Sequence, residues 1–164
     1  MAQDIELATA ITLIQQTLNT YMLSIDKADV ESLRTKVFHK DAKITLLQEV
    51  GLNDYCSLVS GIMKIIRTQH FLFNSVVQAD GTSATANSYF IGYHRVPAGE
   101  QGDACKALFG TLRVDTDSII GGTYTDKLVL APQGWRILER NITLLWQHQT
   151  QSGELMKPDW LPLR

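Results

Sequence analysis

The stretch that decides the fold is RTQHFLFN, residues 67–74, where His70 and Asn74 interrupt an apolar run. In a β-strand alternate side chains share a face, so His70, Leu72 and Asn74 point to one side and the phenylalanines to the other. A buried polar side chain without a partner costs roughly 1–3 kcal/mol. The face that carries the imidazole and the amide therefore predicts a polar partner or a wet cavity rather than a dry core.

The sequence on either side of this stretch predicts helices first and a sheet afterwards. Apolar residues recur every three to four positions before residue 67, whereas β-branched and aromatic residues dominate after it. Turn signals stand at Asp80-Gly81, 97–102, Gly121-Gly122 and 132–134. We expect helices over residues 4–25, 26–38 and 53–67, and strands over 41–47, 68–79, 83–96, 104–116, 122–131 and 134–147. The order indicates an α+β fold with the helices on one face of a single sheet.

The end of the chain and the outer face of the sheet give two further expectations. Residues 148–164 are polar and then punctuated by proline, which predicts an irregular tail that Trp160 and Leu161 could anchor to the body or to a partner subunit. The expected strand 104–116 carries apolar side chains on both faces, so one face would stay uncovered by the helices. A large apolar patch usually marks an interface, which predicts a homodimer or a higher homo-oligomer.

Length and composition describe one domain without nucleic-acid or membrane character. The chain has 164 residues, 45% hydrophobic and 20% charged, with a net charge of −2, so residues 1–164 suit a single domain and give no basic surface for nucleic acid. No apolar run reaches the ~18 residues of a membrane span, and the N-terminus lacks a basic signal-peptide region, so we expect no membrane association and a cytoplasmic location. Cys56 and Cys105 lack CxxC spacing and are expected to be reduced thiols.

Several enzyme classes leave no trace in the sequence. It contains no GxGxxG, GxxxxGK[ST] or GxSxG motif, and the histidines at 39, 70, 94 and 148 show neither HxH nor HExxH spacing. These patterns indicate a protein that uses no metal and no cofactor.

Four segments together resemble the SnoaL-like branch of the nuclear transport factor 2-like superfamily. They are YMLSID (21–26), VFHKDAKI (37–44), TQHFLFN (68–74) and GGTYTDKLVLAPQGWRILER (121–140), and the resemblance spans about residues 5–147. It implies a curved, mixed or antiparallel sheet, cone-shaped and closed by three N-terminal helices around a pocket. Members of the family include dehydratases, isomerases, cyclases, a dehydrochlorinase and non-catalytic small subunits of ring-hydroxylating dioxygenases.

The resemblance also implies a catalytic pair. The scytalone dehydratase and bile-acid dehydratase branch combines an aspartate near the end of the first helix with a histidine on the first long strand, which correspond here to Asp26 and His70. It places Tyr21 in the pocket as a hydrogen-bond donor. From the residues alone, Asp26 could instead cap the second helix through the amides of Ala28 or Asp29, and His70 could be a hydrogen-bonded core residue.

Further side chains are candidates for substrate binding. Tyr55 and Asn74 could help to bind a substrate oxygen, and Trp146 could form a wall of the pocket. His94 falls where some members carry a second histidine or an acid, but a slip of one residue in strand parity would put Tyr93 there instead. Tyrosines of this kind more often pack with a solvated hydroxyl than bind ligands.

These features predict a cofactor-free lyase or isomerase that abstracts a proton from a small hydrophobic carbonyl or hydroxylated ring compound, as a dehydratase does. The alternative is a non-catalytic small-ligand-binding module or an accessory subunit, such as the small subunit of a ring-hydroxylating dioxygenase. The expected partners are a small hydrophobic ligand and a second copy of the chain.

Overall fold

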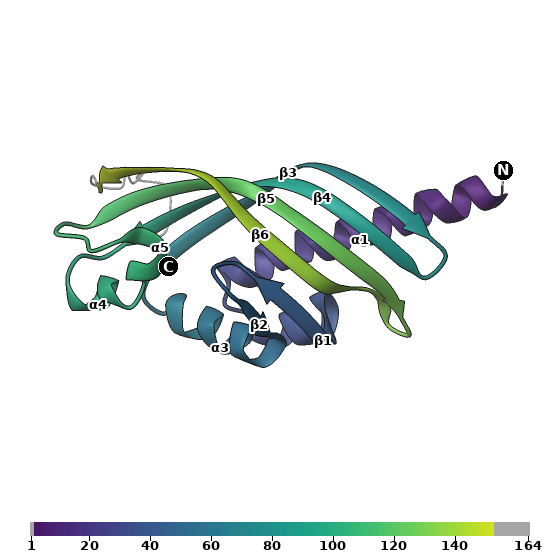
Figure 1. Cartoon of the computed structure of the whole chain (residues 1–164), viewed down its shortest axis with the longest axis horizontal. Helices are drawn as coiled ribbons and strands as arrows, with labels where there is room; N and C mark the ends of the chain where they lie inside the picture. The colour runs from purple at the N-terminus through teal and green to yellow at the C-terminus, as the bar shows by residue number, and fades with distance from the viewer. Residues whose placement is uncertain (1, 153–164) are drawn as a thin grey trace, which may run out of the picture.

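The computed structural model describes residues 2–152, in which a long helix and short helical segments accompany a six-stranded sheet (Figure 1). The helices are α1 (Ala2–Asp26), α2 (Val30–Ser32), the π-helical turn η1 (Leu33–Val37), α3 (Leu52–Ile62), α4 (Glu100–Asp103) and α5 (Lys106–Phe109). The strands are β1 (Phe38–Thr45), β2 (Glu49–Gly51), β3 (Arg67–Asp80), β4 (Ser83–Val96), β5 (Thr116–Ala131) and β6 (Gly134–Gln151).

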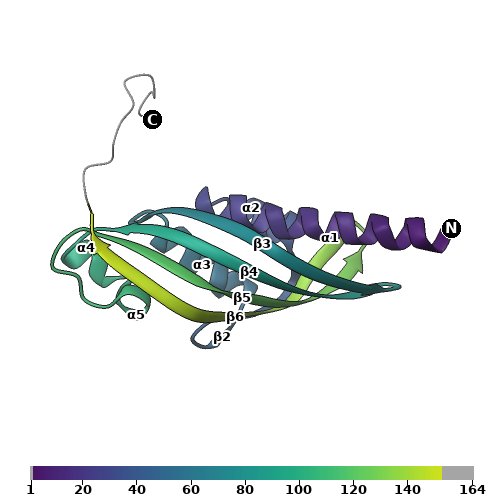
Figure 2. The ribbon, with the colours of Figure 1, turned by 90° about the horizontal axis from the view of Figure 1, so that it is seen from above.

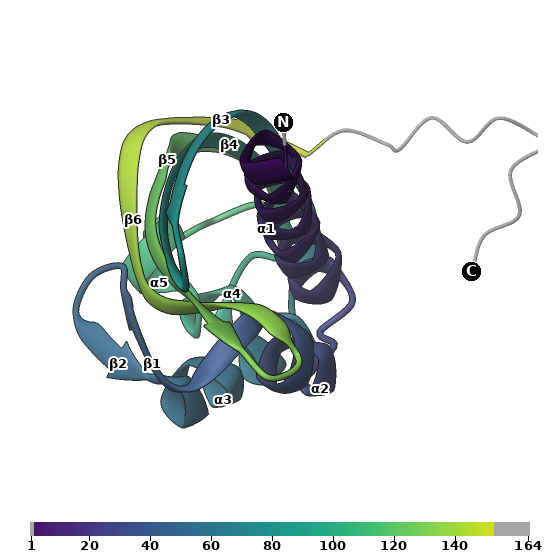
Figure 3. The ribbon, with the colours of Figure 1, turned by 90° about the vertical axis from the view of Figure 1, so that its right-hand side faces the viewer.

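The sheet is mixed and strongly curved. Its strand order is β2-β1-β6-β5-β4-β3, with β1 parallel to β6 and every other pair antiparallel. Helix α1 runs along β3 (Figure 2), and α3 lies below the sheet near β1 and β2 (Figure 3). The sheet does not close on itself, so the helices complete the enclosure. The expected α+β class and the curved sheet packed on N-terminal helices are confirmed.

The core lies on the concave face, where alternate residues of the strands are buried. In β4, Ala84, Ala86, Ser88 and Phe90 are buried and the residues between them are exposed. They pack with apolar side chains of α1, of which Leu18 is fully buried. This alternation buries one face of the sheet against the helices.

The expected strand over residues 104–116 is wrong. The segment forms α5, an irregular connection on each side of it and, at Thr116, the first residue of β5. Helix α5 is followed by Gly110, whose φ of 76° suits glycine. Cys105 and Phe109 are both buried, and their spacing of one helical turn brings them to one face. The apolar residues that we predicted to form a strand therefore provide the buried face of a short helix. This segment does not contribute to the outer face of the sheet.

The expected turn at Gly121-Gly122 is also wrong, because both residues lie inside β5. A Cβ at Gly121 would lie 2.2 Å from the Trp146 ring, and a Cβ at Gly122 would lie 2.3 Å from the carbonyl oxygen of Thr143. These glycines permit close approach of neighbouring groups rather than a chain reversal.

Smaller differences concern the ends of elements. The second helical segment starts at Val30 rather than at 26, and α3 ends at Ile62 rather than at 67. Strand β6 continues through Gln151, so residues 148–151 belong to the sheet and not to a tail. Trp160 and Leu161 lie outside the described residues. Within residues 2–152 no helix is both long enough and apolar enough to cross a bilayer.

Candidate active site

The centre of the site is a hydrogen-bonded pair formed by Asp26, the last residue of α1, and His70 on β3. Asp26 Oδ1 lies 2.7 Å from His70 Nδ1, and Asp26 Oδ2 accepts the backbone N–H of His70 at 2.9 Å. Thr68 Oγ1 also donates to Asp26 Oδ1 at 2.9 Å. The carboxylate stands at the helix end that disfavours negative charge, and these donors offset that cost.

The local structure leaves Asp26 available for this pairing. Helix α1 ends in a Schellman arrangement, in which the Asp29 N–H donates to the carbonyl of Ser24 at 2.8 Å and Ala28 has a φ of 51°. The next helical segment is capped by Asp29, whose Oδ1 accepts the Ser32 N–H at 2.9 Å. The capping role considered for Asp26 therefore belongs to Asp29.

The environment of Asp26 keeps its carboxyl group ionised. Burial alone would raise its pKa, but hydrogen bonds from the His70 side chain and backbone, together with Thr68, lower the pKa below the usual value. The Asp26 carboxylate therefore holds the imidazole through Nδ1 and leaves the opposite edge of the ring, with Nε2, to the pocket that His70 lines.

A second imidazole, His94 on β4, lies against the first. The ring centroids of His70 and His94 are 5.0 Å apart in an edge-to-face arrangement, and Phe109 packs on the other side of His94. Burial and then the neighbouring His70 lower the pKa of His94 from 6.5 to about 4, so this ring is neutral at neutral pH. Its buried Nδ1 has no hydrogen-bond partner among the described residues. Tyr93 points elsewhere and donates its hydroxyl to Asp117 at 2.8 Å.

Gly92 makes room for the two imidazoles. It pairs with His70 across the β3–β4 ladder, and a Cβ at this position would lie 2.7 Å from His94 Cε1 and 2.8 Å from His70 Cδ2. Contacts this short essentially do not occur, so only glycine fits without moving a ring. We did not predict this role from the sequence, where Gly92 reads as a weak position in a strand.

A pair of phenols faces the histidines from the other side of the site. The hydroxyls of Tyr21 on α1 and Tyr55 on α3 are 2.6 Å apart, and both side chains line the pocket. Burial and then Tyr21 raise the pKa of Tyr55 well above its usual value, so its phenol stays protonated. A hydroxyl both donates and accepts, so a hydroxyl of this pair can also hydrogen-bond a ligand oxygen in the pocket.

A buried ion pair lies behind these phenols. Arg140 donates through Nε and a terminal nitrogen to the two carboxylate oxygens of Asp126, each at 2.7 Å, and both side chains are fully buried. The guanidinium stacks 3.9 Å from the Tyr21 ring centroid and 4.3 Å from that of Tyr124. We did not predict this ion pair from the sequence, although the alternation of the two strands places both charges at inward positions.

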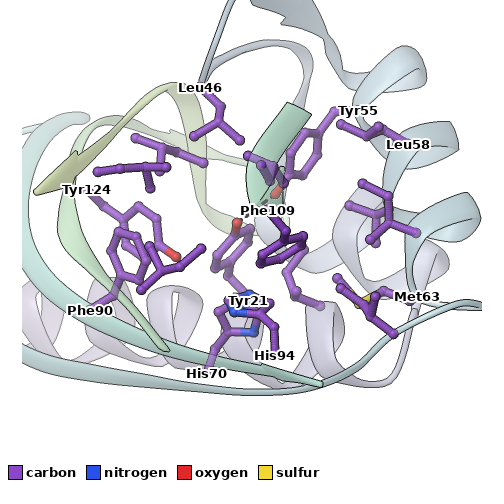
Figure 4. A pocket seen from close by; sticks show the side chains of 18 residues that line it. Tyr21, Leu46, Tyr55, Leu58, Met63, His70, Phe90, His94, Phe109 and Tyr124 are labelled. Atoms are coloured by element: carbon purple, nitrogen blue, oxygen red, sulfur yellow. Dashed lines mark hydrogen bonds between the residues drawn. The ribbon is translucent and has the colours of Figure 1, made fainter. Parts of the chain in front are cut away.

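These groups border an apolar cavity of about 100 Å³, the inner cavity (Figure 4). His70 and His94 lie on one side of it, and Leu46, Tyr55 and Leu58 lie on the opposite side. Its lining is contributed by Tyr21, Ile25, Leu46, Tyr55, Leu58, Val59, Ile62, Met63, Ile66, His70, Phe90, His94, Leu108, Phe109, Ile120, Tyr124, Ile142 and Leu144. Asp26 stands behind His70 and does not line the cavity.

Asn74 and Trp146 do not belong to this cavity, contrary to expectation. The β3–β4 register shifts between Leu72 and Ser75, and this bulge turns Asn74 to an exposed position while Ser75 points inward. Between β5 and β6, Gly121 pairs with Trp146 and Gly122 pairs with Leu144, so Leu145 is an extra residue in β6. The Trp146 ring consequently covers Gly121 on the outer face and is 48% exposed.

Among residues 2–152, no three His, Cys, Asp or Glu side chains gather in a way that could hold a metal ion. Cys56 and Cys105 are free and buried, and burial raises the pKa of both thiols.

Comparison with known proteins identifies the family. The sequence profile of the SnoaL-like domain matches residues 6–141, so the chain belongs to the SnoaL-like family. Among curated protein sequences none shows significant similarity to it.

Solved structures share the fold at low sequence identity. A Kribbella flavida protein, Kfla4162, is 20% identical with a TM-score of 0.71, covering 86% of this chain and 94% of its own. A candidate scytalone dehydratase from Novosphingobium aromaticivorans is 19% identical with a TM-score of 0.70, covering 89% and 91%. A hexachlorocyclohexane dehydrochlorinase from Novosphingobium barchaimii is 13% identical with a TM-score of 0.71, covering 92% and 97%. At these identities the likeness concerns the fold alone.

Proposed function

We propose that this protein is a cofactor-free lyase or isomerase that abstracts a proton next to a carbonyl group of a small hydrophobic ring compound. The observation that carries the proposal is the Asp26–His70 pair, which presents the free edge of an imidazole to an apolar cavity whose opposite side holds paired phenols. A proton next to a carbonyl becomes acidic when the resulting enolate is stabilised, so the reaction needs a base at the carbon and a donor at the oxygen.

Each of these groups has a defined role in the proposed reaction. His70 Nε2 takes the proton from the carbon, and the electron pair moves onto the carbonyl oxygen, which accepts a hydrogen bond from the Tyr21–Tyr55 pair. In a dehydration, the imidazolium then gives its proton to a hydroxyl on the next carbon. The C–O bond breaks, water leaves and a carbon–carbon double bond remains. In an isomerisation the proton returns to a different carbon of the enolate.

Asp26 and His94 support this chemistry without taking up the substrate proton. Asp26 is ionised, fixes the imidazole through Nδ1 and stabilises the imidazolium that forms. His94 is neutral, and its ring lines the cavity beside His70. A neutral neighbour is important because a second positive charge would oppose protonation of His70.

The outer face of the sheet supports a homo-oligomer as part of the same proposal. Phe71, Phe73, Tyr89 and Trp146 are 44%, 50%, 56% and 48% exposed on this face. Phe71 and Trp146 lie in one row across the sheet, because the ladder connects Phe71 to Ile91, Ile91 to Gly121 and Gly121 to Trp146. A continuous apolar row of this kind favours association of two copies through their sheets.

The test of the activity is deuterium exchange on cyclic ketones and hydroxy-ketones in D₂O, together with loss of water from the latter. His70→Ala should lower the rate at least roughly 10²–10⁴-fold while the protein stays folded. Asp26→Asn should also lose activity, and the double variant should cost little more than the worse single one, because the residues act as a unit.

The matched control is His148→Ala, which removes an exposed histidine of β6 outside the cavity and should leave the rate unchanged. A rate that survives His70→Ala would refute the proposal. Ketones that bind but never exchange deuterium would favour the alternative of a ligand-binding module without turnover.

A further inference from the structure

A second cavity of about 330 Å³, the outer cavity, adjoins the inner one. It lies between the β1–β2 region, α3 and the segment of α5, and its lining is aliphatic except for Gln48, Tyr55 and Cys105. Neither member of the Asp26–His70 pair borders it. Its chemistry therefore differs from that of the inner cavity, where imidazoles and phenols converge.

The two cavities share one wall. Leu46, Tyr55, Leu58, Ile62 and Leu108 line both of them. Tyr55 joins them most directly, because its hydroxyl pairs with Tyr21 in the inner cavity while its side chain also borders the outer one. In Figure 4 the shared residues Leu46, Tyr55 and Leu58 lie across the inner cavity from His70 and His94. The outer cavity thus begins at the end of the inner cavity that lies opposite the histidines.

The volumes indicate that the two cavities serve one ligand. Small-molecule sites typically measure about 300–1,000 Å³, and the inner cavity at about 100 Å³ is too small for more than a compact group. The outer cavity alone reaches the lower end of that range but offers hardly any polar groups to orient a ligand. Together they provide the usual combination of a few polar groups and a larger apolar surface.

The entrance to the outer cavity exposes apolar side chains that a ligand would cover. Leu47 is 66% exposed and Leu58 is 48% exposed, and both border this cavity. Ala104 and Ala107 also border it and are exposed, and the same segment contributes Cys105 and Leu108 to the wall. The two exposed alanines leave room for a hydrocarbon group beside the leucines.

We infer that the outer cavity binds an apolar extension of the substrate, so that the substrate is elongated, with one small oxygenated ring at one end and a hydrocarbon chain or second ring at the other. The inference rests on the proposed function, because it takes the inner cavity as the place where the oxygenated end reacts. It assigns substrate selectivity in part to residues that border the outer cavity alone, among them Ala104 and Ala107.

The test is calorimetric titration with cyclohexanone and its 2-methyl, 2-ethyl, 2-propyl and 2-pentyl derivatives, in which the chain leaves the ring beside the carbonyl, on the side of Tyr55 where the outer cavity begins. Burying a methylene should tighten binding about fourfold, so 2-propylcyclohexanone should bind roughly 50-fold more tightly than cyclohexanone. Ala107→Phe and, separately, Ala104→Phe fill the outer cavity. Each should reduce this gain to severalfold at most and leave the affinity for cyclohexanone within about twofold.

Two controls separate this inference from the proposed activity. Ala8→Phe places the same group on an exposed position of α1 that borders neither cavity, and it should preserve the full gain. His70→Ala should preserve the gain as well, since His70 does not border the outer cavity, even though deuterium exchange is lost. A wild-type affinity that does not rise with chain length would overturn the inference, as would a gain that survives both alanine-to-phenylalanine changes. A rising series without any deuterium exchange would refute the proposed function alone.

Discussion

Gly92→Ala should damage the site through a single added methyl group. The new Cβ would lie 2.7 Å from His94 Cε1 and 2.8 Å from His70 Cδ2, so each ring must retreat by roughly 0.6–0.7 Å to restore an ordinary contact of 3.4 Å. His70 is also held by Asp26 at 2.7 Å, so its movement stretches that hydrogen bond. Displacements approaching 1 Å can cost about 10²-fold in rate, and we expect a loss of roughly 10–100-fold.

The measurements are deuterium exchange into cyclohexanone and a ¹⁵N long-range correlation spectrum of the imidazole nitrogens, which reports the His70–Asp26 hydrogen bond without any substrate. Overpacking should also lower the free energy of unfolding by about 1–3 kcal/mol, measured with urea. The matched control is Gly61→Ala near the end of α3, where an added Cβ meets no atom within 4 Å. It should leave the spectrum unchanged and stabilise the helix slightly. An unaltered His70 spectrum in folded Gly92→Ala would refute the packing argument.

Three further results are expected. Since burial lowers the pKa of His94 from 6.5 to about 4, the unfolded chain binds more protons between these values, and stability should fall by up to about 3 kcal/mol as the pH drops through this window. His94→Gln should remove this loss of unfolding free energy, measured by urea titration at each pH. A variant whose stability still falls with pH as steeply as that of the wild type would contradict the assignment to His94. Arg140→Met should lower the free energy of unfolding, measured with urea, by about 3–5 kcal/mol, because Asp126 is left charged and unpaired. The double variant Arg140→Met/Asp126→Leu should regain a large part of that loss. A double variant whose loss equals the sum of the two single losses would contradict this expectation. Sedimentation at on the order of tens of micromolar should show a dimer that Trp146→Ser weakens, and a strictly monomeric wild type would exclude the outer-face interface.

The sequence predicted the class of fold and the meeting of Asp26 with His70, because amphipathic periodicity and the family resemblance both act over whole elements. Positions that depend on local register could not be predicted in the same way. The bulge after Leu72 reverses the direction of Asn74, and nothing in a run of apolar residues marks where a strand takes up an extra residue. The extra residue Leu145 has the same effect on Trp146.

Three other features that we did not predict can be recognised from the sequences of related chains. Cys105 and Phe109 are one helical turn apart, which favours the short helix that we took for a strand. Asp126 and Arg140 occupy inward positions of adjacent strands, where a charge requires a buried partner. Gly92 lies directly across the ladder from a candidate catalytic histidine, and that pairing can be read once the hairpin is aligned.

The segment of residues 97–115 between β4 and β5 has a consequence for how this protein can diversify. It supplies Leu108 and Phe109 to the inner cavity, yet it contributes no strand to the sheet and no residue to the Asp26–His70 hydrogen bonds. Connections of this kind tolerate changes in length and sequence better than the elements they join. Selection or directed evolution can therefore exchange this segment to admit new ligands, while the rigid sheet and α1 keep the reacting groups in place.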